Sequence, residues 1–319
     1  MIPASDRQLL LVVGAPRSGT TWLHHMLAAH PAMASMEEEL TVFTYLALWD
    51  RRFQTEKANL DQGRWRQGAP LLYGESEFYE GLRSLAEHAY ARLLTRKPSA
   101  SHLLDKHPDY ARHLPLIQKL FPNAKVIHLI RDGREVVVSM MSAKKRLGFG
   151  AGEIQGATRH WVTNLLAARQ AEKLLGAGQY MEVRYEELKA ETTTRLKAVF
   201  DFCQLPVTDD FLLRITEEYD IRNKQVSRGD ATLNRMRDKP GAIWQAKLSL
   251  EERWTMDRLA GHLLQDLGYS KPGWWALRPG DNLRMAYLSN LRKLKNTLGS
   301  AKHTWMHSTP QRSALPSTQ

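Results

Sequence analysis

The 319-residue sequence is poor in cysteine and has no long hydrophobic run. Its single cysteine, Cys203, excludes an intrachain disulfide and a cysteine-based zinc site. No stretch approaches the roughly 18 consecutive apolar residues of a transmembrane helix, so we expect none. The apolar run near the N-terminus follows no basic segment and leads into a glycine motif instead of a cleavage site, which argues against a signal peptide. We therefore expect a cytoplasmic protein.

Internal repeats and low-complexity tracts are also missing ahead of the C-terminus. Hydrophobic residues make up 43% and charged residues 25% of the chain, the composition of a globular protein. The formal net charge of +11 is uneven, because residues 271–319 hold eight lysines or arginines and one acid and so carry +7. This basic tail is either a solvated extension or a contact for an anionic partner or a membrane surface. The remaining chain carries about +4, so we expect no specific nucleic-acid binding.

Three runs of the sequence are strand-like, at residues 9–13, 125–130 and 180–185. Apolar residues at helical spacing follow each run. Strands that alternate with helices predict an α/β fold with a central, mainly parallel sheet flanked by helices. The segment 37–101 is rich in aromatic and charged residues, and we interpret it as a helical insertion or lid over the sheet.

A glycine loop joins the first strand-like run to the helix that follows it. Gly14 and Gly19 stand five positions apart, a spacing that lets backbone N–H groups surround a phosphate at a helix N-terminus. A nucleotide-hydrolysing loop has lysine and then serine or threonine after the second glycine, whereas this chain has Thr20 and Thr21. The cation, Arg17, lies inside the loop instead. This departure predicts an anion other than a nucleoside triphosphate, bound without a metal ion.

Two motifs together resemble a known family. Residues 16–21, PRSGTT, resemble the 5′-phosphosulfate-binding loop of sulfotransferases that use 3′-phosphoadenosine 5′-phosphosulfate (PAPS). Residues 131–139, RDGREVVVS, resemble the 3′-phosphate-binding segment of the same family. Weaker matches extend the resemblance over about residues 8–270. The motifs are nearest to the tyrosylprotein and glucosaminyl 3-O branches, and the chain resembles a bacterial member.

The resemblance implies a P-loop-like sulfotransferase fold. It implies a sulfotransferase domain over residues 1–280, followed by the basic tail at 281–319, partly disordered. The implied donor is PAPS, with no metal. The residues implied to bind it are Arg17, Ser18, Gly19, Thr20, Thr21, Trp22, Arg131, Ser139, Tyr185, Arg237 and Lys239.

The resemblance also implies an in-line transfer to a hydroxyl or, as a second choice, an amine of the acceptor. Arg17 and Lys106 are expected to stabilise charge on the leaving phosphate. In the two nearest branches a glutamate shortly after the first helix is the base, and this chain has three there. Counted from Arg17, Glu38 takes the tyrosylprotein register and Glu39 the glucosaminyl register. We rank Glu38 first, Glu39 second and Glu37 third.

One histidine remains an alternative base. In the cytosolic small-molecule branch a histidine two residues after the lysine does this work, and here that position is Pro108. His107 is next to that position but only one residue after the lysine. The sequence does not name the acceptor, and a small molecule, a carbohydrate and a peptide are all compatible, as is any oligomeric state.

Two other functions stay open on the sequence. A nucleotide-dependent small-molecule kinase shares the type of loop but would need magnesium and ATP. A non-catalytic nucleotide- or nucleic-acid-binding protein would keep the fold without turnover.

Overall fold

The computed structural model describes residues 7–64, 66–148, 150–220 and 243–290. The chain divides into two compact units, Met1–Trp244 and Gln245–Gln319. The first unit holds the sheet and both family-like motifs. The division of the chain at residue 280, and the role of the segment 37–101 as a lid, stay predictions.

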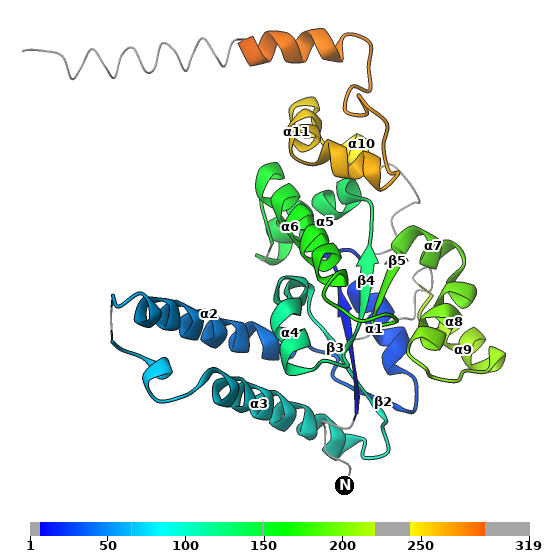
Figure 1. Ribbon diagram of the computed structural model, residues 1–319. Coiled ribbons are helices and arrows are strands. Elements are labelled where there is room, and N and C mark those ends of the chain that lie inside the picture. Colours follow the sequence, from blue (N-terminus) through cyan, green and yellow to red (C-terminus); the bar gives the residue numbers. More distant parts are fainter. Residues whose placement is uncertain (1–6, 65, 149, 221–242, 291–319) are drawn as a thin grey trace, which may run out of the picture. The chain divides into compact units, whose positions relative to one another are not determined.

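The sheet of the first unit has five strands, all parallel, in the order β2-β3-β1-β4-β5 (Figure 1). The strands are β1 (Gln8–Val13), β2 (Met33–Ser35), β3 (His102–Lys106), β4 (Lys125–Ile130) and β5 (Tyr180–Arg184). The predicted α/β fold with a parallel sheet is therefore confirmed. Two strands, β2 and β3, were not among the three predicted, and the third predicted strand ends one residue early, because Tyr185 begins a helix.

Helices follow the strands and cover both faces of the sheet (Figure 1). They are α1 (Thr20–Ala28), α2 (Val42–Asp61), α3 (Glu75–Arg96), α4 (Leu114–Leu120), α5 (Gly133–Leu147), α6 (Ile154–Glu172), α7 (Tyr185–Ala190), α8 (Thr192–Phe202) and α9 (Asp209–Glu218). The described residues of the first unit also form two 3₁₀ turns, η2 (Ala69–Leu71) and η3 (Pro108–His113).

Alternate residues of β1 enter two separate apolar cores. Leu9, Leu11 and Val13 pack with buried residues of α2, α3, α4 and η3. Leu10 and Val12 pack with buried residues of α1 and α7 to α9. A strand buried on both faces reads as a continuous apolar run, which is why β1 was predictable.

The register of the parallel strands brings their carboxyl ends to one edge of the sheet. Val12 of β1 pairs with Lys106 of β3, and Val13 pairs with His128 of β4. Ile130, the last residue of β4, pairs with Arg184, the last residue of β5. The loops that follow β1, β3 and β4 therefore leave the sheet side by side, where ligands of open α/β sheets bind.

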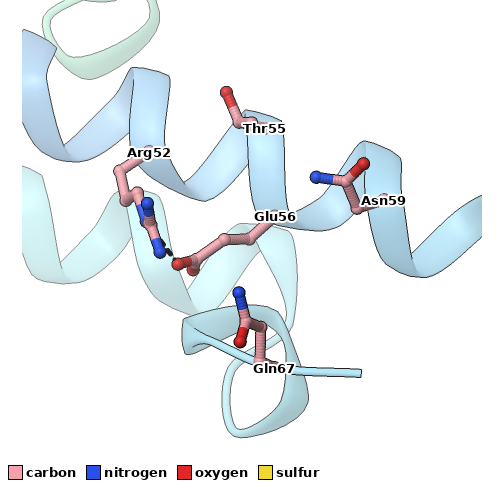
Figure 2. A pocket seen from close by; sticks show the side chains of 5 residues that line it. All are labelled: Arg52, Thr55, Glu56, Asn59 and Gln67. Atoms are coloured by element: carbon pink, nitrogen blue, oxygen red, sulfur yellow. Dashed lines mark hydrogen bonds and ion pairs between the residues drawn. The ribbon is translucent and has the colours of Figure 1, made fainter. Parts of the chain in front are cut away.

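The segment between β2 and β3 forms a hairpin of two long helices, α2 and α3 (Figure 1). Glu56 of α2, only 9% exposed, accepts hydrogen bonds from Arg52 and from the backbone N–H of Ala69 in η2. A small cavity lies beside this contact and is lined by Arg52, Thr55, Glu56, Asn59 and Gln67 (Figure 2). Glu56 thus fixes the turn that returns the chain to α3.

The described part of the second unit is helical. Its helices are the end of α10 (Ile243–Lys247), then α11 (Leu250–Asp266), and residues 281–290 are helical as well. Ser249 and Glu252 form a capping box at the start of α11, which satisfies two backbone donors. The Arg253 side chain donates to the carbonyls of Leu248 and Trp275, and so ties α11 to the segment after it.

Candidate active site

The loop 14–19 leaves β1 at the carboxyl edge of the sheet and enters α1. A Cβ atom on Gly14 would lie 2.5 Å from the backbone oxygen of Leu129, and one on Gly19 would lie 2.6 Å from the ring of Tyr185. Gly19 also has a φ of 101°, which side chains rarely adopt. Glycine is therefore required for the close approach of this loop to β4 and to the start of α7.

An arginine cluster, consisting of Arg17, Arg131 and Ser139, joins the two motifs. The Nε of Arg17 donates to the Ser139 hydroxyl at 3.1 Å, and the Nη1 of Arg131 donates to the backbone oxygen of Arg17 at 3.1 Å. Arg17 has a φ of 76°, in the left-handed region, as few non-glycine residues have. The Arg131 guanidinium also lies over the ring of Tyr185, 4.4 Å from its centre. Two segments far apart in sequence thus form one cationic surface.

The start of α5 fixes the position of Arg131. Asp132 is the N-cap residue, and its side chain accepts hydrogen bonds from the backbone N–H and the guanidinium of Arg134. The backbone N–H of Asp132 donates to Glu186 at 2.9 Å. Sequence reasoning missed both carboxylates, although Asp-Gly directly after a strand is a usual N-cap signal.

A glutamate–lysine cluster, consisting of Glu39, Lys106 and His107, lies at the end of β3. The Lys106 side chain is 5% exposed, and its Nζ donates to Glu39 Oε1 at 2.7 Å and to the Thr21 hydroxyl at 3.2 Å. The other oxygen of Glu39, Oε2, lies 3.5 Å from His107 Nε2. The glutamate side chain is 39% exposed, so the cluster pairs a buried cation with a carboxylate that reaches solvent.

Asp105 precedes Lys106 and points to the opposite face of β3, into the core under the helical hairpin. It is 2% exposed and accepts hydrogen bonds from the hydroxyls of Tyr90 at 2.8 Å and Tyr110 at 3.0 Å. Burial raises the pKa of Asp105, and the two tyrosines oppose that rise. These bonds tie β3 to α3 and η3 directly behind the lysine.

His24 of α1 connects the same region from the other side. Its Nε2 lies 2.6 Å from the Ser35 hydroxyl, which donates to the backbone oxygen of Leu104 at 2.9 Å. Burial, together with the nearby charges of Lys106 and His25, lowers the pKa of His24 to about 3. His24 is therefore neutral at physiological pH and links α1 to the ends of β2 and β3.

Comparison with known proteins decides the family. Residues 10–209 match the model of the sulfotransferase family, nearly two thirds of the chain. The chain belongs to the sulfotransferase family. It is thus an enzyme of the class EC 2.8.2.-, which moves sulfuryl groups, and the predicted family is confirmed.

Individual relatives of this sulfotransferase are distant. It is 27% identical over 273 residues to protein-tyrosine sulfotransferase 1 of Danio rerio, covering 83% of this chain and 73% of the relative. It is 27% identical over 278 residues to a putative protein-tyrosine sulfotransferase of Caenorhabditis briggsae, covering 83% and 91%. A mouse sulfotransferase, SULT7A1, solved in complex with PAP, is 16% identical with a TM-score of 0.49, covering 82% of this chain and 86% of that one.

The structure of the sulfotransferase places the predicted loop residues in different surroundings. Ser18 is 1% exposed, and its hydroxyl donates to the Ala15 carbonyl at 2.7 Å, inside the loop. Thr20 is buried, whereas Thr21 contacts Lys106. Trp22 is buried and donates from its indole to the backbone oxygen of Tyr219 at 2.8 Å.

The remaining predicted residues divide between the two clusters and the surroundings. Tyr185 is 4% exposed and supports both Gly19 and Arg131. All three glutamates are exposed, and Glu39 contacts Lys106. Arg237 and Lys239 lie outside the described residues, as does the tail beyond residue 290.

Within the ranges that the structure describes, no helix is long and apolar enough to cross a membrane. The same part of the sulfotransferase holds no group of three His, Cys, Asp or Glu side chains arranged to bind a metal ion.

Proposed function

We propose that this sulfotransferase moves a sulfuryl group from PAPS to a hydroxyl of its acceptor, with Glu39 as the general base. The observation that carries the proposal is the meeting of the two motifs: Arg131 donates to the backbone of Arg17, whose side chain donates to Ser139. An adenosine bisphosphate carries one phosphate at each end of its ribose, and two cationic groups on neighbouring strands suit such a molecule.

The residues present fit this donor. The glycines let the loop pack tightly against Leu129 and Tyr185, and backbone N–H groups before α1 favour an anion. We assign the 5′-phosphosulfate to this loop with Arg17, and the 3′-phosphate to Arg131 and Ser139. PAPS supplies a sulfuryl group whose sulfur bonds to the acceptor oxygen as its bond to the 5′-phosphate oxygen breaks.

Lys106 is the cation proposed to stabilise the leaving phosphate. Its ammonium is buried next to Thr21, at the first turn of α1, so it stands beside the phosphate-binding loop. A fixed donor at a developing negative charge lowers a barrier by about 3 kcal/mol, because it needs no reorganisation.

Glu39 is the glutamate that geometry favours as the base. Its Oε1 accepts a hydrogen bond from Lys106, so the carboxylate lies next to the ammonium group proposed to stabilise the leaving phosphate. It is partly exposed and can be reached by a hydroxyl from solvent. The acceptor proton would pass to Glu39 as the acceptor oxygen bonds to sulfur. The count from Arg17 that ranks Glu38 first uses sequence position alone and does not take this contact into account.

Donor binding is tested by isothermal titration of the full chain with adenosine 3′,5′-bisphosphate and with ATP, each with and without magnesium. We expect tight binding of the bisphosphate without magnesium. A preference for ATP with magnesium would favour a kinase and overturn the proposal.

Transfer is tested with isotope-labelled PAPS and a panel of alcohols, phenols, saccharides and tyrosine peptides, read as a mass shift of the acceptor. We expect one class to gain a sulfuryl group while bisphosphate is released in equal amount. Binding of the bisphosphate without transfer to any compound or to water would indicate a protein that lacks turnover.

A further inference from the structure

His107 follows β3 directly, and its ring has a defined tautomer. It is the N-cap residue of η3, and its Nδ1 accepts a hydrogen bond from the backbone N–H of Asp109 at 3.1 Å. A ring nitrogen that accepts from an N–H group carries a lone pair, so the proton of the neutral ring is on Nε2. The backbone of η3 therefore determines which ring nitrogen is the donor.

That donor faces the glutamate. Nε2 lies 3.5 Å from Glu39 Oε2, which is longer than a formed hydrogen bond, and such contacts in catalytic sites commonly shorten when substrates bind. The ring is 12% exposed and packs against Tyr110, with centres 5.0 Å apart and planes 32° apart. Tyr110 is held in turn by Asp105. The imidazole is thus fixed by two contacts with η3, the Asp109 N–H group and the buried ring of Tyr110.

We propose that His107 is a positioning residue that orients the Glu39 carboxylate through Nε2–H. This inference rests on the proposed function of Glu39 as the base. Lys106 Nζ donates to Oε1 of this carboxylate, and His107 Nε2 lies 3.5 Å from the other oxygen, Oε2. When Lys106 serves the leaving phosphate, His107 keeps the carboxylate aligned and leaves Oε1 to take the acceptor proton.

The same geometry sets His107 apart from a base. Nδ1 is occupied by the Asp109 N–H group, and Nε2 carries the proton that faces Glu39. Neither ring nitrogen then has a lone pair directed at an acceptor hydroxyl. The histidine acts on the reaction through Glu39.

Two substitutions separate the positioning role from the capping role. His107→Asn keeps an acceptor near the position of Nδ1, for the Asp109 N–H group, but removes the Nε2 donor. His107→Gln places an N–H donor near the position of Nε2 but removes the cap. The full chain is assayed with PAPS and the acceptor found by the panel, or with water as acceptor, by release of the bisphosphate.

We expect His107→Asn to lower kcat about tenfold, with the KM for PAPS within about twofold of wild type, because only the base is misaligned. His107→Gln should keep kcat within about threefold of wild type but have the lower Tm, since it loses the cap. A purely structural histidine would give the reverse order in kcat, and that result would overturn the inference.

The Glu39→Gln background gives a second test. There, adding His107→Asn should change kcat by less than about twofold, because the carboxylate that it positions is gone. A full tenfold further loss would show that His107 acts independently of Glu39 and would overturn the inference.

Nitrogen NMR of histidine-labelled protein separates this inference from the proposed function, because it needs no acceptor. We expect the His107 proton on Nε2, with a resonance that moves in Glu39→Gln. A proton on Nδ1 overturns the inference even in an active enzyme. Absence of bisphosphate binding and of transfer in the wild type instead overturns the proposed function.

Discussion

The arginine cluster and the glutamate–lysine cluster share one edge of the sheet but are built differently. The arginine cluster depends on backbone geometry: a glycine loop pressed against Leu129 and Tyr185, and a left-handed Arg17 whose own carbonyl is an acceptor. The glutamate–lysine cluster depends on side chains, one of them in an exposed connection between β2 and α2. Both clusters join segments that lie far apart in the sequence, the first mainly through the backbone of two short motifs and the second through side-chain contacts.

The largest effect should distinguish Glu39, in the glutamate–lysine cluster, from its neighbour Glu38. Glu39→Gln should lower kcat by about 100-fold or more, because it removes the proton acceptor while keeping the size of the side chain. The affinity for adenosine 3′,5′-bisphosphate should stay within about twofold, as measured by titration calorimetry. Glu38→Gln is the matched control and should keep kcat within about threefold. The opposite order would move the base to the tyrosylprotein register.

The next effect concerns the first cluster alone. Arg131→Ala should weaken bisphosphate binding roughly 10- to 100-fold, because it removes a charged hydrogen-bonding partner of a phosphate. Titration of the variant beside Arg92→Ala, which changes an exposed arginine of α3, measures this. Equal affinities in wild type and Arg131→Ala would disprove the assignment of the second motif.

A backbone change in the glycine loop of the first cluster should lower stability more than a comparable change in an open turn. Gly19→Ala should lower the free energy of unfolding by about 2 kcal/mol, because the new Cβ meets the Tyr185 ring at a φ that alanine resists. Gly63→Ala, where φ is 66° and nothing lies within 4 Å, isolates the backbone cost and should lose about 1 kcal/mol. Chemical denaturation measures both. Equal losses would mean that the ring moves aside freely.

The smallest effect is a pH dependence of the free energy of unfolding that arises from His128 of β4. His128 is 1% exposed and pairs with the last residue of β1, and burial lowers its pKa from 6.5 to about 4. The unfolded chain therefore binds the proton first, so stability falls as the pH drops from 6.5 toward 4. Between pH 7 and pH 5.5 the loss from this group is about 1 kcal/mol.

Replacing the ring tests that assignment. His128→Asn should reduce the pH dependence of the free energy of unfolding by this amount, as measured by denaturation at pH 7 and at pH 5.5. An unchanged slope in the variant would attribute the acid sensitivity to other buried groups, such as His24 or His102.

The sequence predicted the parts of the fold that are apolar on both faces. The strand β1 has five consecutive apolar residues, β4 is apolar except at Lys125 and His128, and the helices after them have apolar residues at helical spacing. The strand β2 has three residues, and β3 contains Asp105 and Lys106 at positions that are buried in the folded chain. A hydrophobic pattern does not predict a buried strand that contains charged residues. The groups that form hydrogen bonds with these charges come from distant elements.

The candidate site follows the same division. The residues of the arginine cluster stand within two short motifs, so they could be named before the fold was known. The pairing of Glu39 with Lys106 could not, because three consecutive glutamates offer the same chemistry and only the path of the chain after β2 brings one of them to the lysine. The contacts of His107 depend on the turn of η3, which no periodicity indicates.

The alternation of Asp105 and Lys106 along β3 has a consequence for how the enzyme matures. Neighbouring residues of a strand point to opposite faces, so a shift of one position would put the ammonium among the tyrosines and the carboxylate beside the loop. A chain in that shifted register would bury both charged groups without their hydrogen-bond partners, and its free energy would be higher than that of the native register. The correct strand register therefore places Lys106 beside the phosphate-binding loop as soon as the chain is folded.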